Sequence, residues 1–146
     1  MKHRTAYLML RFFSSALRAA IDLFWPAAIV LAIHAGSILF FALDYTWDEL
    51  LHALGGASMA WAAWRACRRW QAPRRLPDVP VWFLAAFSLF FAVFAGVLWE
   101  FYEYIAFVTW APQFDLTLRD TIKDLAFDLG GAAAACLLLG KVRHQA

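Results

Sequence analysis

Charge is scarce in this chain. Only 16% of its 146 residues are Asp, Glu, Lys or Arg and 64% are hydrophobic, whereas ordinary soluble domains carry about 25% charged and about 45–50% apolar residues. A single unit of this length cannot hide so much apolar surface from its surroundings, so much of it must face something other than water. The composition therefore excludes an ordinary soluble domain and predicts a membrane protein.

Cysteines and recognisable catalytic signatures are also few. The two cysteines, Cys67 and Cys136, lie far apart, which excludes a disulfide framework and a CxxC site. The sequence has no phosphate-binding loop and no dinucleotide fingerprint. The serines within the apolar stretches, Ser37, Ser58 and Ser88, are not spaced with an acid and a histidine as a catalytic triad requires. The net charge of +2 is not gathered on a soluble face, so nucleic acid is not an expected partner.

Four apolar stretches predict an all-α fold, a four-span transmembrane helix bundle that forms one domain over residues 1–146. Each stretch is near or above the roughly 20 residues that cross a bilayer core. Their approximate limits are 21–43, 48–66, 80–108 and 120–140. The second and fourth stretches are the weaker signals because they begin with acidic residues. Their Gly and Ala content is typical of helices that pack against protein rather than lipid.

The first twenty residues precede these spans and carry a basic residue at every seventh position, at Arg4, Arg11 and Arg18. Arg11 breaks the apolar run from Ala6 to Leu10, so a signal peptide is not expected. Two interpretations stay open for residues 1–20. They form either an amphipathic helix at the inner leaflet or a frayed basic tail.

The basic residues indicate the orientation of the chain. Eleven of the thirteen Lys and Arg precede the first span, lie near or in the connection between the second and third, or follow the fourth. Because positive residues accumulate on the cytoplasmic side, both termini and the middle connection are predicted to lie in the cytoplasm, with the protein in the inner membrane. Nine of the eleven acids then fall in the outer half of the molecule.

Several of these acids share helix faces with a histidine and with glycines. Side chains three or four residues apart lie on one face of a helix, and the three later spans each carry such a set. The sets are Asp48 and His52; Glu100 and Glu103; and Asp120, Asp124 and Asp128. Glycines continue the same faces at Gly55, Gly56, Gly96 and Gly131. Since small residues let helices approach closely, the acids are expected to converge inside the bundle.

Converging carboxylates need neutralisation. Asp128 lies about 12 Å deeper than Asp120 at the rise of an α-helix, and an ionised carboxylate at such depth costs about 2.5 kcal/mol or more. Three hypotheses stay open: a bound divalent cation, a network that shares protons or pairs with Lys123 and Arg119, or simple capping by Asp120 and Asp124 in the first turn of their helix.

The cation hypothesis names one divalent ion as cofactor, because carboxylates with one imidazole suit Mg²⁺, Mn²⁺ or Zn²⁺. Its candidate ligands are Asp48, His52, Glu100, Glu103, Asp120, Asp124 and Asp128. Glu100 and Glu103 are also candidate catalytic bases. His34, near the middle of the first span, could reach Asp128, but a neutral histidine bonded to a carbonyl is the favoured interpretation.

The sequence resembles the YjdF-like small membrane proteins and, more distantly, the VanZ-like family in three segments. In chain order, these segments are Trp47–Gly56, Trp99–Glu103 and Asp120–Ala132. The shared patterns are D-x-x-x-H-x-x-G, a Glu pair that ends a later helix, and D-x-x-x-D-x-x-x-D-x-x-G-A. The resemblance covers about residues 44–135 and implies an architecture rather than a chemistry, although VanZ-like members are linked to glycopeptide resistance. One departure is the connection Ala111–Arg119, which is shorter than its YjdF-like counterpart and puts a role for the outer loop in doubt.

Three functions are consistent with these patterns. The first is an outward-facing intramembrane site that binds a cation and, through it, an anionic lipid or envelope precursor, with or without hydrolysis. The second is a small proton-coupled carrier, which in four spans would require a homo-oligomer. The third is a non-catalytic assembly subunit. Membrane lipids are the expected partners, and whether the protein is an enzyme stays open.

Overall fold

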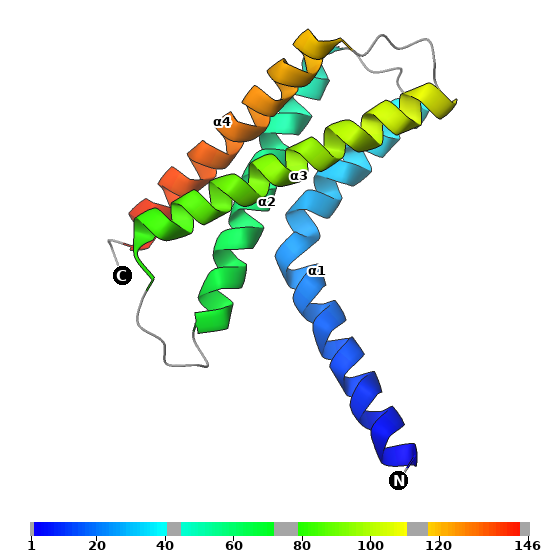
Figure 1. The fold of residues 1–146 in the computed structure, drawn as a ribbon, viewed down its shortest axis with the longest axis vertical. Coiled ribbons are helices and arrows are strands. Elements are labelled where there is room, and N and C mark those ends of the chain that lie inside the picture. Colours follow the sequence, from blue (N-terminus) through cyan, green and yellow to red (C-terminus); the bar gives the residue numbers. More distant parts are fainter. Residues whose placement is uncertain (1, 41–44, 72–78, 111–116, 144–146) are drawn as a thin grey trace.

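The structure, a computed structural model, describes residues 2–40, 45–71, 79–110 and 117–143. These residues form four α-helices and no strand (Figure 1). The helices are α1 (Lys2–Phe40), α2 (Tyr45–Gln71), α3 (Val81–Trp110) and α4 (Leu118–Arg143). The all-α prediction is therefore confirmed for the part of the chain that the structure describes.

Local sequence signals account for where α3 and α4 begin. The carbonyl of Pro80 accepts hydrogen bonds from the backbone N–H groups of Phe83 and Leu84, at 3.0 and 3.2 Å, so α3 starts directly after this proline. Thr117 caps α4, because its Oγ1 accepts a hydrogen bond from the backbone N–H of Asp120 at 3.2 Å. The Thr117 cap therefore fixes where α4 begins and places Asp120 in the first turn of this helix.

Helix α1 continues without a break from the basic N-terminal segment into the first apolar stretch. Residues 2–20 are helical, as an amphipathic helix requires, but they do not form a separate element. Pro26 lies inside α1, where it removes a backbone hydrogen bond and favours bending. Figure 1 shows that α1 bends and that its N-terminal half projects away from the other three helices.

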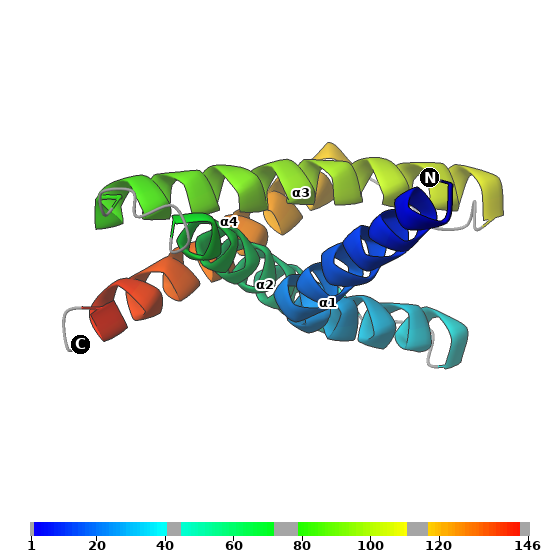
Figure 2. The same ribbon diagram turned by 90° about the horizontal axis from the view of Figure 1, so that it is seen from below.

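Helix α2 is the centre of the bundle, because it packs against each of the other three helices. Figures 1 and 2 show that α2 and α4 cross and that α3 runs along one side of this pair. The C-terminal ends of α1 and α3 and the N-terminal ends of α2 and α4 lie at the same end of the molecule. This end, here called the polar end, carries most of the acids.

Helices α2 and α4 touch through glycines at two reciprocal points. A Cβ atom at Gly56 would collide with the backbone of Asp128, and one at Gly131 would collide with the backbone of Ala53. Beyond this crossing, a cluster of small side chains packs between α2, α3 and α4. Its members are Ala60, Ala92, Ala132 and Cys136. Glycine and alanine thus let the backbones meet, as the sequence pattern predicts.

Large apolar side chains cover the outside of the bundle while polar side chains lie within it. Phe90 on α3 and Leu137 on α4 are 72% and 68% exposed, whereas Asp124 is 2% exposed. Two helical segments, Arg11–Gly36 and Val81–Ile105, are long and apolar enough to cross a membrane by length and composition. Such an apolar exterior suits contact with lipid better than contact with water.

Candidate functional site

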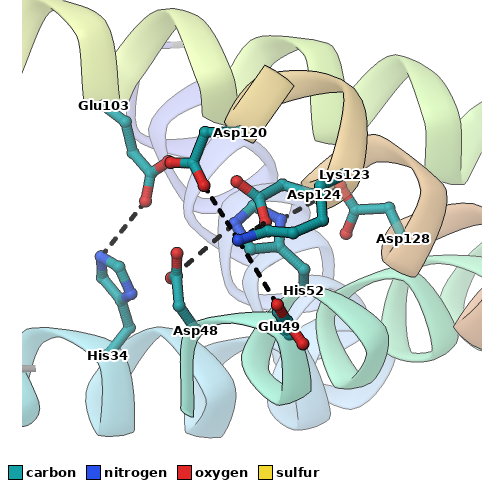
Figure 3. A network of polar contacts seen from close by, with 9 residues as sticks. All are labelled: His34, Asp48, Glu49, His52, Glu103, Asp120, Lys123, Asp124 and Asp128. Atoms are coloured by element: carbon teal, nitrogen blue, oxygen red, sulfur yellow. Dashed lines mark hydrogen bonds and ion pairs between the residues drawn. The ribbon is translucent and has the colours of Figure 1, made fainter. Parts of the chain in front are cut away.

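Polar side chains from all four helices meet near the polar end (Figure 3). Sequence patterns predict contributions from three helices, and the structure adds the fourth through α1. The side chains shown are His34 from α1; Asp48, Glu49 and His52 from α2; Glu103 from α3; and Asp120, Lys123, Asp124 and Asp128 from α4. Helix spacing and the shared depth of the helix ends bring them together.

Five of these side chains are shielded from the surroundings. They are His34, His52, Glu103, Asp124 and Asp128. His52 and Glu103, for example, are only 4% and 6% exposed. Because water reaches none of the five freely, each polar atom needs a partner inside the protein or a bound species.

His52 lies at the centre of the cluster with its two ring nitrogens facing different carboxylates. Its Nδ1 lies 3.4 Å from Oδ2 of Asp128, and its Nε2 lies 3.9 Å from Oδ1 of Asp48. Among the described residues, Nε2 has no hydrogen-bond partner. Histidines that bind metals commonly donate the N–H of one ring nitrogen to a carboxylate and bind the ion with the other. His52 has this arrangement, with Asp128 as the carboxylate that orients the ring.

Asp128 fits beside His52 because glycines surround it. A Cβ atom at Gly96 would collide with its carboxylate, and Gly56 packs directly against its backbone. The Oδ1 of Asp128 would lie 3.8 Å from a Cβ at Gly55, which is ordinary contact. The glycines noted in the sequence thus make room for the buried carboxylate of Asp128 and also allow close contact between helices.

Lys123 neutralises the outer part of the cluster. Its Nζ lies 2.9 Å from Asp120, 3.4 Å from Glu49 and 3.9 Å from Oδ1 of Asp124. Lys123 and Asp120 are therefore well paired, as the Lys-paired hypothesis expects for these two. Asp124 is not satisfied in the same way, because its buried Oδ1 has no hydrogen-bond partner among the described residues.

His34 is the residue whose place the sequence did not predict. Its Nε2 lies 3.7 Å from Oε1 of Glu103, and its ring packs edge-on against Trp99 with centroids 4.8 Å apart. The sequence favoured a neutral histidine bonded to a carbonyl and left Asp128 as the alternative partner, but Asp128 faces His52. A histidine within an apolar span was the available signal, but the rotation of α1 about its axis decides which acid it meets.

Three overlapping sets of side chains could hold a metal ion, each with ligand atoms within 4.8 Å of one another. The sets are His34, Asp48 and Glu103; Asp48, His52 and Asp124; and His52, Glu100 and Glu103. Ligand atoms that bind one ion at about 2.1 Å in a tetrahedral site lie about 3.4 Å apart, so the widest pairs in these sets would move about 1 Å closer to hold an ion. Asp120 and Asp128 belong to none of these sets and instead contact Lys123 and His52.

The model of a family described as predicted membrane protein (DUF2238) matches residues 5–145, almost the whole chain. The chain belongs to this family. It is the family of the YjdF-like proteins, so the resemblance seen in the sequence is confirmed. In comparisons with the curated proteins and with the solved structures, nothing matches the chain.

This DUF2238 protein concentrates more negative than positive charge at its polar end. Seven carboxylates reach the cluster, and Lys123 supplies one positive charge within it. The carboxylates are those of Asp48, Glu49, Glu100, Glu103, Asp120, Asp124 and Asp128. In a member of a membrane protein family, such an excess requires protons, protonated histidines or a bound cation.

Proposed function

We propose that the protein spans the inner membrane four times, with both termini in the cytoplasm and the polar end near the outer leaflet. The distribution of Lys and Arg supports this orientation. Large exposed apolar side chains on α2 and α4 support spans by these helices as well, and Leu54 and Leu129 are 44% and 46% exposed. Successive helices run in alternating directions along the bundle, which agrees with four spans.

At the polar end, the protein binds one divalent cation between Asp48, His52 and Asp124. The observation that carries this proposal is a pair of buried atoms without hydrogen-bond partners among the described residues, Nε2 of His52 and Oδ1 of Asp124. Both belong to one set of possible ligands with Asp48. Asp128 holds the other ring nitrogen of His52, as a carboxylate behind a metal-binding histidine does.

Two carboxylates and an imidazole favour Mn²⁺ or Zn²⁺ over Mg²⁺, because Mg²⁺ prefers oxygen ligands and keeps several waters. Three protein ligands leave coordination positions for an exogenous oxygen. An anionic head group of a lipid or an envelope precursor supplies such an oxygen at the membrane surface. The proposed function is therefore binding of an anionic membrane-associated head group through the cation.

A hydrolytic activity would use Glu100 as general base. One of its carboxylate oxygens is buried without a hydrogen-bond partner among the described residues, and Glu100 shares a set of possible ligands with His52. The ion would polarise a phosphoryl oxygen of the head group. Glu103 is a weaker candidate base, because it faces His34.

The position of the buried acids favours this proposal over a proton-coupled carrier. Among the described residues, buried acids and histidines extend from the polar end only as far as Asp128. Towards the other end, the small apolar cluster of Ala60, Ala92 and Ala132 follows. A carrier needs titratable groups or an opening on both sides of the membrane.

Metal analysis of the detergent-purified protein tests the proposal. After metal removal and exposure to Mn²⁺ or Zn²⁺, we expect one tightly bound ion per chain. The double variant His52→Ala with Asp124→Asn should lose it, because two of three ligands are removed. The matched control is Asp22→Asn, an exposed acid at the far end of the bundle that pairs with Arg69 at 2.9 Å. A wild-type protein without bound ion, or equal metal content in all three proteins, would contradict the proposal.

A further inference from the structure

A cavity of about 320 Å³ lies between α1, α2 and α3 and touches the proposed metal site. Its polar lining residues are His34, His52 and Asp128. Apart from these and the indole N–H of Trp99, aliphatic and aromatic side chains and glycines form its wall. A cavity that is apolar along most of its length and polar near one end fits an amphiphile rather than a small ion alone.

The cavity exists because small residues line it and α1 stands off from α3. Ala27 and Ala28 on α1 and Ala92 and Ala95 on α3 leave space where larger side chains would close the gap. Along the described residues, α1 packs its backbone against α2 alone. Near the polar end, the contact of His34 with α3 side chains bridges the two helices.

The length and the location of the cavity indicate its occupant. On α1, the lining runs from Phe24 to His34, which corresponds to about 15 Å along a helix. These residues lie in the apolar segment Arg11–Gly36, and the α3 lining lies in Val81–Ile105. A cavity at this depth has hydrocarbon chains as its surroundings, so an apolar space open to it is filled by hydrocarbon more readily than by water.

We propose that this cavity holds one hydrocarbon chain of an anionic membrane lipid whose head group lies at the metal site. The inference rests on the proposed function for the position of the head group. The hydrocarbon chain of the lipid lies along Phe24, Leu31 and Met59, and the head group lies beside His34 and His52. The substrate class of the site is therefore a lipid with an anionic head group, recognised by its chain as well as by its charge.

Crosslinking with phosphatidic acid that carries a diazirine in one acyl chain tests this inference. In vesicles that contain this probe, the wild-type protein should be labelled on Phe24, Leu31 or Met59. Ala95→Leu fills the cavity and should lower this labelling about tenfold or more. Ala86→Leu is the matched control, because Ala86 is exposed on α3 and does not line the cavity. It should leave the labelling unchanged.

A second filling variant, Ala28→Leu on α1, gives the same test if Ala95→Leu does not fold. The metal content of each variant separates the two proposals. A filled cavity should lower labelling by the acyl chain about tenfold or more while the ion is retained. Labelling of Phe24, Leu31 and Met59 that persists in both filling variants, or labelling confined to outward residues such as Phe90, would overturn the cavity inference even if the ion is present. Labelling of the cavity in a protein that binds no ion would overturn the metal proposal, while the proposed binding site for the hydrocarbon chain would be supported.

Discussion

Replacing Gly131 with Ala is expected to disrupt the crossing of α2 and α4, whereas the same change at Gly130 is expected to be harmless. A Cβ at Gly131 would collide with the backbone of Ala53, and backbone cannot move aside as a flexible side chain can. Around Gly130, a Cβ would meet nothing within 4 Å. We expect Gly131→Ala to lower the free energy of unfolding by about 3 kcal/mol.

Thermal or denaturant unfolding of the two detergent-purified variants measures this difference. Gly130→Ala should equal or slightly exceed the wild type, because Ala is favoured over Gly by up to about 1 kcal/mol inside a helix. Because the two variants carry the same substitution at neighbouring positions of one helix, neither amino-acid composition nor helix propensity can explain a difference in their stability. Equal stability of the two variants would show that α2 and α4 do not touch through Gly131.

Asp128→Asn is expected to lower the affinity for Mn²⁺ or Zn²⁺ by about 10–100-fold, the usual effect of removing a carboxylate behind a metal-binding histidine. Asn keeps the shape that fits beside Gly96 and Gly56, so the bundle should still assemble. The lost charge acts through His52, whose Nδ1 lies 3.4 Å from Asp128. Titration calorimetry on the folded fraction measures the affinity, and unfolding of the same sample measures the stability.

The control is Asp120→Asn, which removes the same charge from the same helix. Asp120 is paired with Lys123 at 2.9 Å and belongs to none of the three ligand sets. Partly exposed ion pairs contribute less than about 1 kcal/mol, so the affinity should change less than about fivefold. If Asp128→Asn lowers stability but leaves the affinity at the wild-type value, Asp128 is structural and the assembly-subunit hypothesis is favoured.

Helical periodicity was sufficient to predict which side chains of a single helix act together. The spacing of Asp48 and His52 placed both on one face, and in the structure both face the same cluster. The spacing of Asp120, Asp124 and Asp128 did the same for α4, although exact steps of four drift around the helix. That drift leaves Asp120 partly exposed beside Lys123, whereas Asp124 and Asp128 are buried.

Relations between helices were harder to predict, because they depend on the rotation and crossing angle of each helix. Glycine patterns indicated that α2 and α4 approach closely, yet nothing in them shows that Asp128 faces His52. The partner of His34 depends on the packing of α1, and so does the cavity beside it. Positions of apolar and small residues thus predict contact, while side-chain pairing across helices requires the coordinates.

Membrane spans are also only partly predictable from average hydropathy. Hydropathy indicates Arg11–Gly36 and Val81–Ile105 clearly, because each contains a long window of high mean hydropathy with few charged residues. Helices α2 and α4 mix an apolar outer face with a polar inner face, so their average hydropathy understates how much of their surface suits lipid. Exposed Leu54 and Leu137 lie on the outer faces of α2 and α4, opposite in character to buried His52 and Asp124.

The most direct test is an experimental structure of the protein prepared with Mn²⁺, with anomalous scattering used to locate the ion. We expect one peak at about 2.0–2.3 Å from Nε2 of His52 and from carboxylate oxygens of Asp48 and Asp124. An anomalous map without a peak there, with Lys123 or ordered water between these side chains instead, would contradict this expectation.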